Sequence, residues 1–273
     1  MSVPDNAFLH RYGPWAVIAG ASHGVGAAFA RALAERSLNC VLVARRGDAL
    51  AQLKGELEQR YAIEVLVVIQ DLSQPDACER LLAAVGERQV GLFIYNAGGD
   101  PYITRFLDTS TENWGALLRL NCLTVMQCSH AFGAAMLERG QGGLLLVGSQ
   151  AALGGIRKLA MYTATKGFAL NLGESLWAEW KDRGVDVLNL VIGTVDTPTM
   201  RDAMVKLNIA DALTMTLPKA DDLALLALEQ LGNGPTLIHP EDTLVQVETA
   251  PGPARRAQVL SKSAQAAVFI GND

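Results

Sequence analysis

The sequence predicts an α/β fold built on a doubly wound parallel sheet of about seven strands, with helices on both faces. Short β-rich apolar runs alternate with segments of helical spacing, and a glycine-rich turn follows the first run. This alternation indicates βαβ units, whose parallel strands are covered on both faces. The chain has 273 residues, which suits one large domain with an extensive core.

Six apolar runs rich in branched side chains are expected to form strands: 15–19, 39–44, 64–70, 92–95, 143–147 and 185–191. Helical spacing predicts helices at 25–36, 48–61 and 75–85, and one long helix or a bent pair over 111–139. A further helix follows the fifth strand, whereas the part from about residue 240 shows no pattern that predicts an element. Ligands of such sheets bind at the carboxyl ends of the strands, so the residues that follow the strands are the first candidates for a site.

Composition and charge narrow the class of protein. Half of the residues are hydrophobic, 19% are charged and the net charge is −5, so neither nucleic acid nor an anionic membrane is an expected partner. The apolar runs are too short or too interrupted to span a bilayer, and the N-terminus lacks the pattern of a secretory signal. The four cysteines match no metal or redox spacing, so we expect reduced thiols, no metal site and a cytoplasmic location.

A glycine-rich turn joins the first expected strand to the first helix. The chain reads Gly20-Ala21-Ser22-His23-Gly24-Val25-Gly26, a longer turn than the common G-x-G-x-x-G. Glycines allow a tight turn and let the backbone approach a pyrophosphate, which then lies at the helix N-terminus. The turn therefore predicts a dinucleotide site, with a glycine turn that binds nothing as the alternative.

Arg45 and Arg46 follow the second expected strand and bear on the choice of cofactor. A site for NAD places an acid about 20 residues after the glycines, whereas a site for NADP offers an arginine. No acid occurs at 41–47, and a guanidinium binds phosphate through two hydrogen bonds. We expect NADP(H) to be preferred over NAD(H), with Arg45 ahead of Arg46 and His23 adding a polar contact. The alternative is that both arginines are solvated surface charges.

Tyr162 and Lys166 lie four residues apart on an expected helix, so their side chains share one face. A nearby cation lowers the pKa of a phenol from its ordinary value of about 10, which suits the group to acid/base chemistry. A Tyr-x-x-x-Lys pattern alone is weak, and a solvated pair is the plain alternative. Ser149, thirteen residues upstream at the end of the fifth expected strand, adds a hydroxyl to the pattern.

In this order and spacing the motifs resemble the short-chain dehydrogenase/reductase family, of the single-domain, Rossmann-like type with a Tyr-x-x-x-Lys active site. The resemblance runs from about residue 15 to 197 and departs from the family pattern at Ala19, in place of Thr, and at Ile192, in place of Pro. It implies a catalytic tetrad of Asn121, Ser149, Tyr162 and Lys166. The cofactor-binding residues expected from the motifs are Gly20, Ser22, His23, Gly24, Val25, Gly26, Arg45, Arg46, Asp71, Leu72, Asn96, Ala97, Gly98, Tyr162, Lys166, Gly193, Val195 and Thr197.

By this resemblance the activity is hydride transfer between NADP(H) and a small-molecule ketone, aldehyde or alcohol. Ser149 would hold the substrate oxygen and Tyr162 would donate the proton. Lys166 would lower the pKa of Tyr162 and hold the nicotinamide ribose, and Asn121 would hold a water that relays protons. An apolar helical flap near 198–217, on a single domain spanning 1–273, hints at an apolar substrate. Further residues expected to line its pocket are Tyr102, Gln150, Gly154 and Ile156.

Other functions stay open. An NAD-dependent alcohol dehydrogenase would use the same tetrad with the other cofactor, and a ketoacyl reductase belongs to the same chemical class. A non-catalytic dinucleotide-binding sensor or scaffold is a different class, and would be expected to have a damaged tetrad, whereas all four positions hold the appropriate side chains. The resemblance also suggests a homodimer or homotetramer.

Overall fold

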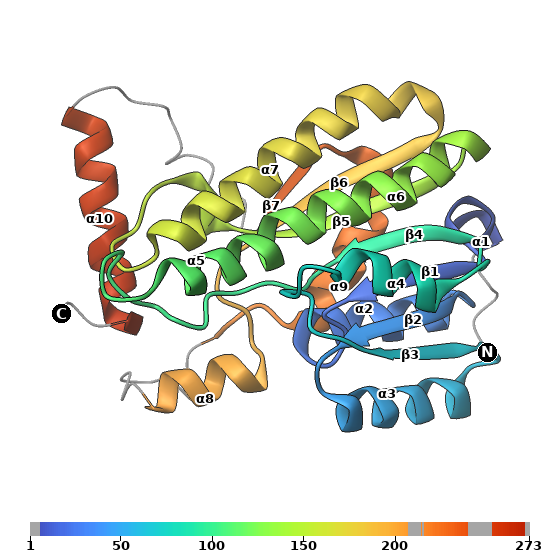
Figure 1. Ribbon diagram of the computed structural model, residues 1–273. Helices are drawn as coiled ribbons and strands as arrows, with labels where there is room; N and C mark the ends of the chain where they lie inside the picture. The colour runs from blue at the N-terminus through green and yellow to red at the C-terminus, as the bar shows by residue number, and fades with distance from the viewer. Residues whose placement is uncertain (1–5, 207–213, 215, 240–252, 271–273) are drawn as a thin grey trace.

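A seven-stranded sheet forms the centre of the structure, a computed structural model that describes residues 6–206, 214, 216–239 and 253–270 (Figure 1). Every neighbouring pair of strands is parallel, and the order is β3-β2-β1-β4-β5-β6-β7. The strands are β1 (Trp15–Ala19), β2 (Asn39–Ala44), β3 (Val65–Ile69), β4 (Val90–Tyr95), β5 (Gly142–Ser149), β6 (Val185–Ile192) and β7 (Thr236–His239). The order reverses between β1 and β4, and the predicted fold class is confirmed.

Helices cover both faces of the sheet (Figure 1). The α-helices are α1 (Asn6–Tyr12), α2 (Gly24–Glu35), α3 (Gly47–Arg60), α4 (Ala77–Val85), α5 (Thr111–Leu118), α6 (Thr124–Arg139), α7 (Ala160–Trp180), α8 (Pro198–Lys206), α9 (Ala220–Glu229) and α10 (Pro253–Ile270). Helices α2, α3 and α9 pack on one face, whereas α4, α6 and α7 pack on the other. The strands are therefore buried on both sides.

Each strand contributes side chains to two hydrophobic cores, one on each face of the sheet, because successive side chains point to opposite faces. Ala16 and Ile18 of β1 enter the cluster under α2 and α9, whereas Val17 and Ala19 enter the cluster under α4 and α6. All five β1 residues are buried. Burial on both faces explains why the strands read as continuous apolar runs in the sequence.

The long helical segment predicted over 111–139 is a pair of helices joined by a π-helical turn. This turn, η1 (Arg119–Leu123), lies between α5 and α6 and carries Asn121. A π-turn inserts a residue into the helical repeat and is frequent at functional sites. The sequence pattern offered a long helix or a bent pair, but it gave no sign of the π-turn.

Some elements were not placed by the sequence patterns. Strand β7 completes the sheet, and its four residues are too few for a periodic signal. Helix α10 forms in the part where no element was predicted, and Ser263 on it accepts a hydrogen bond from the Arg157 backbone nitrogen at 3.0 Å. Residues 198–206 of the expected flap form α8, whereas 207–213 and 215 lie outside the described residues. None of the helices in the described ranges has the length and apolarity that a membrane span requires.

Candidate functional site

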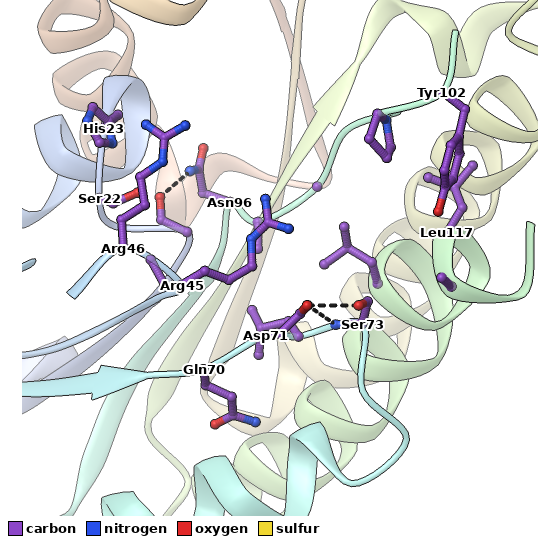
Figure 2. A pocket seen from close by; sticks show the side chains of 18 residues that line it. Ser22, His23, Arg45, Arg46, Gln70, Asp71, Ser73, Asn96, Tyr102 and Leu117 are labelled. Atoms are coloured by element: carbon purple, nitrogen blue, oxygen red, sulfur yellow. Dashed lines mark hydrogen bonds between the residues drawn. The ribbon is translucent and has the colours of Figure 1, made fainter. Parts of the chain in front are cut away.

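A cavity of about 510 Å³ lies at the carboxyl ends of β1 to β4, where the strand order reverses (Figure 2). The predicted cofactor residues that line it are Gly20, Ser22, His23, Arg45, Arg46, Asp71, Leu72, Asn96, Ala97 and Gly98. The lining residues not predicted for the cofactor are Ala44, Gln70, Ser73, Pro101, Tyr102, Ala116, Leu117 and Leu120. The structure thus joins four predicted motifs that are far apart in the chain into one cavity wall.

The glycine turn needs its small residues because other parts of the backbone lie against it. Gly20 has a φ of +84°, and a Cβ there would lie 2.7 Å from the Ala97 nitrogen. A Cβ on Gly26 would overlap the Gly20 carbonyl oxygen, and one on Gly24 would lie 2.8 Å from the Thr197 methyl group. The tight turn places Ser22 and His23 in the cavity wall just before α2 begins. A helix N-terminus at this position favours an anionic group.

Asn96 connects the glycine turn with the segment after β4. Its Nδ2 donates a 2.9 Å hydrogen bond to the Gly20 carbonyl oxygen, and its backbone nitrogen donates one of 3.0 Å to Ala19 (Figure 2). These bonds span the strand pair at which the sheet order reverses. Asn96 therefore fixes the spacing between two walls of the cavity.

Arg45 and Arg46 are exposed and extend along one side of the cavity, with His23 and Ser22 beside Arg46 (Figure 2). Asp71 lies on the floor, and its Oδ1 accepts hydrogen bonds from the Ser73 nitrogen at 2.9 Å and the Ser73 hydroxyl at 2.8 Å. Burial acts to raise the pKa of the Asp71 carboxyl, but the Ser73 bonds and the Arg45 charge outweigh it, so the pKa lies below its ordinary value. Asp71 is thus a carboxylate at neutral pH.

Ser149 and Tyr162 meet beyond the carboxyl end of β5. Ser149 is the last residue of that strand, Tyr162 lies in the first turn of α7, and the Ser149 hydroxyl is close enough to the phenol to influence its pKa. Burial raises the pKa of the Tyr162 phenol above its ordinary value, while the nearby Ser149 hydroxyl acts in the opposite direction and the Asp100 charge adds to the rise. The sequence predicted a lowered pKa, and that prediction is wrong in this structure because burial dominates.

Lys166 is buried one helical turn after Tyr162. Its Nζ donates a 3.1 Å hydrogen bond to the Val147 carbonyl oxygen and lies 5.8 Å from the centre of the Tyr162 ring. Burial lowers the pKa of this ammonium group from 10.5 to about 8. Lys166 therefore shares a face with Tyr162 as predicted, but it is held by the backbone of β5 rather than by the phenol.

Asn121 reaches the same region from the π-turn. Its Nδ2 donates to the Gly99 carbonyl oxygen at 3.2 Å and to the Thr165 hydroxyl at 3.1 Å. Its Oδ1 is buried and has no hydrogen-bond partner within the described ranges. A Cβ on Gly98 would lie 3.0 Å from this oxygen and 3.1 Å from the Lys166 nitrogen. All four residues of the predicted tetrad therefore converge on one region.

The segment after β6 lies outside the 510 Å³ cavity. Val195 is buried, and the Thr197 hydroxyl accepts a 3.2 Å bond from the Met200 nitrogen at the start of α8. A Cβ on Gly193 would lie 3.1 Å from the Gln150 Oε1. Gln150 also donates to the His239 carbonyl oxygen at 3.2 Å, so it ties this segment to β7. The sequence placed Gln150 in a substrate pocket and gave no signal for this bridging contact.

A family model described as short chain dehydrogenase matches residues 14–207. The chain belongs to this family. Among similar proteins, the 7β-hydroxysteroid dehydrogenase of Mediterraneibacter gnavus is 30% identical over 231 residues, which cover 85% of this chain and 88% of that protein. The predicted resemblance is confirmed.

Two solved structures support this short-chain dehydrogenase assignment. One, from a study of 7β-hydroxysteroid dehydrogenase stereoselectivity, is 27% identical with a TM-score of 0.85, covering 93% of this chain and 98% of that one. The other, a short-chain dehydrogenase from Sphingobium yanoikuyae in complex with NADPH, is 25% identical with a TM-score of 0.74, covering 93% and 94% of the two chains.

As a short-chain dehydrogenase, the protein is an oxidoreductase that interconverts an alcohol and a carbonyl compound by hydride transfer with a nicotinamide dinucleotide. Its candidate site combines a glycine turn at the start of α2, a cavity at the carboxyl ends of β1 to β4 and a buried set of proton-bearing side chains. Across the described residues, no three His, Cys, Asp or Glu side chains gather as ligands for a metal ion.

Proposed function

We propose that the protein is an NADP(H)-dependent oxidoreductase that interconverts an apolar ketone or aldehyde and its alcohol, with Asn121, Ser149, Tyr162 and Lys166 as catalytic residues. The observation that carries this proposal is the convergence of three side chains: the Ser149 hydroxyl acts on the Tyr162 phenol, and the buried Lys166 nitrogen lies 5.8 Å from the centre of the Tyr162 ring. A hydroxyl and a phenol so placed can together hold one substrate oxygen.

The cavity residues fit a nicotinamide dinucleotide that carries a 2′-phosphate. Both residues after β2 are arginines, so an acid for the ribose of NAD is missing there, and Arg45 offers a guanidinium fork instead. Asp71, Leu72 and the segment 96–98 would enclose the adenosine, and Gly193, Val195 and Thr197 would hold the nicotinamide. The similar enzyme of Sphingobium yanoikuyae holds NADPH. When bound, the cofactor supplies or accepts the hydride.

Tyr162 moves the proton in this proposal. During reduction its phenol donates a proton to the substrate oxygen, which the Ser149 hydroxyl holds in place. Because burial raises the pKa of Tyr162, the phenol is protonated at neutral pH and is ready to donate. Alcohol oxidation needs the phenolate, so it is expected to become faster as pH rises.

Lys166 and Asn121 support that proton transfer. The Lys166 ammonium would hold the ribose hydroxyls of the cofactor and pass protons toward Tyr162. The buried Asn121 Oδ1, which lacks a partner within the described ranges, would accept a hydrogen bond from a relay water. A buried acceptor of this kind gains stability when a water fills the site.

An apolar substrate is supported by the relatives and by the surroundings of α8. The relatives named 7β-hydroxysteroid dehydrogenase make a ketosteroid or hydroxysteroid the first substrate to test. A helical flap near 198–217 on a single domain spanning 1–273 is part of this proposal, and the described start of that flap is α8, in which Met204 is buried. Exposed apolar side chains, Leu118, Met126 and Phe168, support a homodimer or homotetramer. A cytoplasmic location stays a prediction.

The test is a titration of the purified protein with NADPH and NADH, followed by turnover on a panel of ketosteroids and small ketones. Tyr162→Phe keeps the ring and removes the proton, so turnover should fall by about 100-fold or more while the Kd for NADPH changes less than twofold. Near-normal turnover in this variant would refute the role of Tyr162. Preference for NADH would favour the NAD-dependent alternative, and cofactor binding without turnover on any substrate would favour a sensor.

A further inference from the structure

The segment that follows β4 has a defined conformation that places Tyr102. The Oδ1 of Asp100 accepts hydrogen bonds from the Tyr102 nitrogen at 2.9 Å and the Ile103 nitrogen at 3.2 Å. Ile103 has a φ of +41°, a left-handed conformation that a β-branched residue rarely adopts. The carboxylate thus holds the backbone in a turn that directs the side chain of Tyr102.

An aromatic group backs the Tyr102 ring. The ring lies edge-on to Trp114, with centroids 5.7 Å apart, and Trp114 stacks on Phe106 at 6.0 Å with an interplanar angle of 8°. The Trp114 Nε1 donates a 3.0 Å hydrogen bond to the Phe106 carbonyl oxygen, and Trp114 itself is buried in α5. Since its support is fixed, Tyr102 can contact a ligand at a small cost in conformational entropy.

Tyr102 lies in the wall of the 510 Å³ cavity, together with Leu117 and across from Arg45 and Arg46 (Figure 2). Tyr162 and Lys166 are not among the residues that line this cavity. Within the described part of the chain, the Tyr102 hydroxyl has no hydrogen-bond partner. The sequence placed Tyr102 in the substrate pocket, whereas the cavity places it with the residues proposed for the cofactor.

We propose that Tyr102 contacts the adenosine part of the cofactor and contributes to its affinity, an inference that rests on the proposed NADP(H) function. The two sides of the cavity differ in chemistry: one side carries the guanidinium groups of Arg45 and Arg46, and the other carries Tyr102 with Leu117 (Figure 2). A 2′-phosphate suits the first side and the flat adenine ring suits the second. The free hydroxyl of Tyr102 can donate to a nitrogen or oxygen of the nucleoside.

The experiment measures the affinity of the unmodified protein and of three variants for two ligands. Isothermal titration gives the Kd for NADPH and for adenosine 2′,5′-bisphosphate, which is the adenosine end of NADPH without the nicotinamide. Tyr102→Leu removes the ring, Tyr102→Phe removes only the hydroxyl, and Tyr61→Leu is the matched control because Tyr61 is half-buried outside the cavity. Melting temperatures verify that each variant folds.

We expect Tyr102→Leu to weaken both ligands by about tenfold and by the same factor, as loss of an aromatic contact to a base does. Tyr102→Phe should weaken both by about threefold, and Tyr61→Leu by less than twofold. Unchanged affinity in both Tyr102 variants would overturn the inference while leaving the NADP(H) function intact. A loss for NADPH without a loss for the bisphosphate would also overturn it, and absence of NADPH binding in the unmodified protein would overturn both proposals.

Discussion

Replacement of Arg45 is the most direct test of why this short-chain dehydrogenase should prefer NADP(H). Arg45 is exposed at the end of β2, and its charge contributes to the lowered pKa of Asp71 across the cavity. Arg45→Ala removes the guanidinium fork without filling the cavity. Arg45→Asp adds a carboxylate that would repel a 2′-phosphate and could accept bonds from the ribose of NADH.

The magnitude follows from the kind of bond that is lost. A hydrogen bond to a charged group contributes about 1.5–3 kcal/mol, which corresponds to a factor of about 10 to 150 in affinity. Arg46 remains beside the site and the arginine is exposed to solvent, so the lower half of this range applies. We expect Arg45→Ala to raise the KM for NADPH about 10- to 40-fold and to change the KM for NADH less than threefold.

The assay is steady-state kinetics with both cofactors on one ketone, at two ionic strengths. Because the site is open to solvent, added salt should reduce the advantage of the unmodified protein. Arg183→Ala is the matched control, since Arg183 is an exposed arginine on a 3₁₀ turn away from the cavity. If neither Arg45 variant changes the ratio of kcat/KM for the two cofactors, the phosphate-binding role of Arg45 is refuted.

Two further predictions concern stability. Lys166 has a pKa of about 8 in the folded protein and an ordinary value of 10.5, so the unfolded chain binds more protons between these pH values and the free energy of unfolding should rise with pH across that interval. Urea titrations at several pH values should show a smaller rise in Lys166→Met. An identical dependence on pH in the two proteins would contradict the argument that burial lowers the pKa of Lys166. Gly26→Ala should lower the melting temperature by several degrees and abolish NADPH binding, because the new Cβ would overlap the Gly20 carbonyl oxygen in the glycine turn. Its control, Gly55→Ala on the exposed face of α3, meets no atom within 4 Å and should gain about 0.5–1 kcal/mol from helix propensity; equal melting temperatures for the two variants would show that the turn has room for a side chain.

The local features of this protein were predictable from the sequence. The strands at 15–19 and 39–44 have the predicted bounds because burial on both faces leaves unbroken apolar runs. Arg45 lies in the cavity wall because it directly follows β2, and Tyr162 shares a face with Lys166 because helix geometry fixes a four-residue spacing. Each of these inferences needs only residues that are close together in the sequence.

The tertiary structure decided what depends on contacts between distant segments. Asn96 donates a hydrogen bond to Gly20, which lies 76 residues earlier in the chain. The Asn121 amide donates to Thr165 from a π-turn that the hydrophobic periodicity of the sequence did not predict. Burial sets the pKa values of Tyr162 and Lys166, and the nearby charge alone suggested the opposite direction for Tyr162. The sequence determines which side chains stand at the strand ends. Only the order of the strands and the packing of helices on them determine which of those side chains share a cavity and how far each is exposed to solvent.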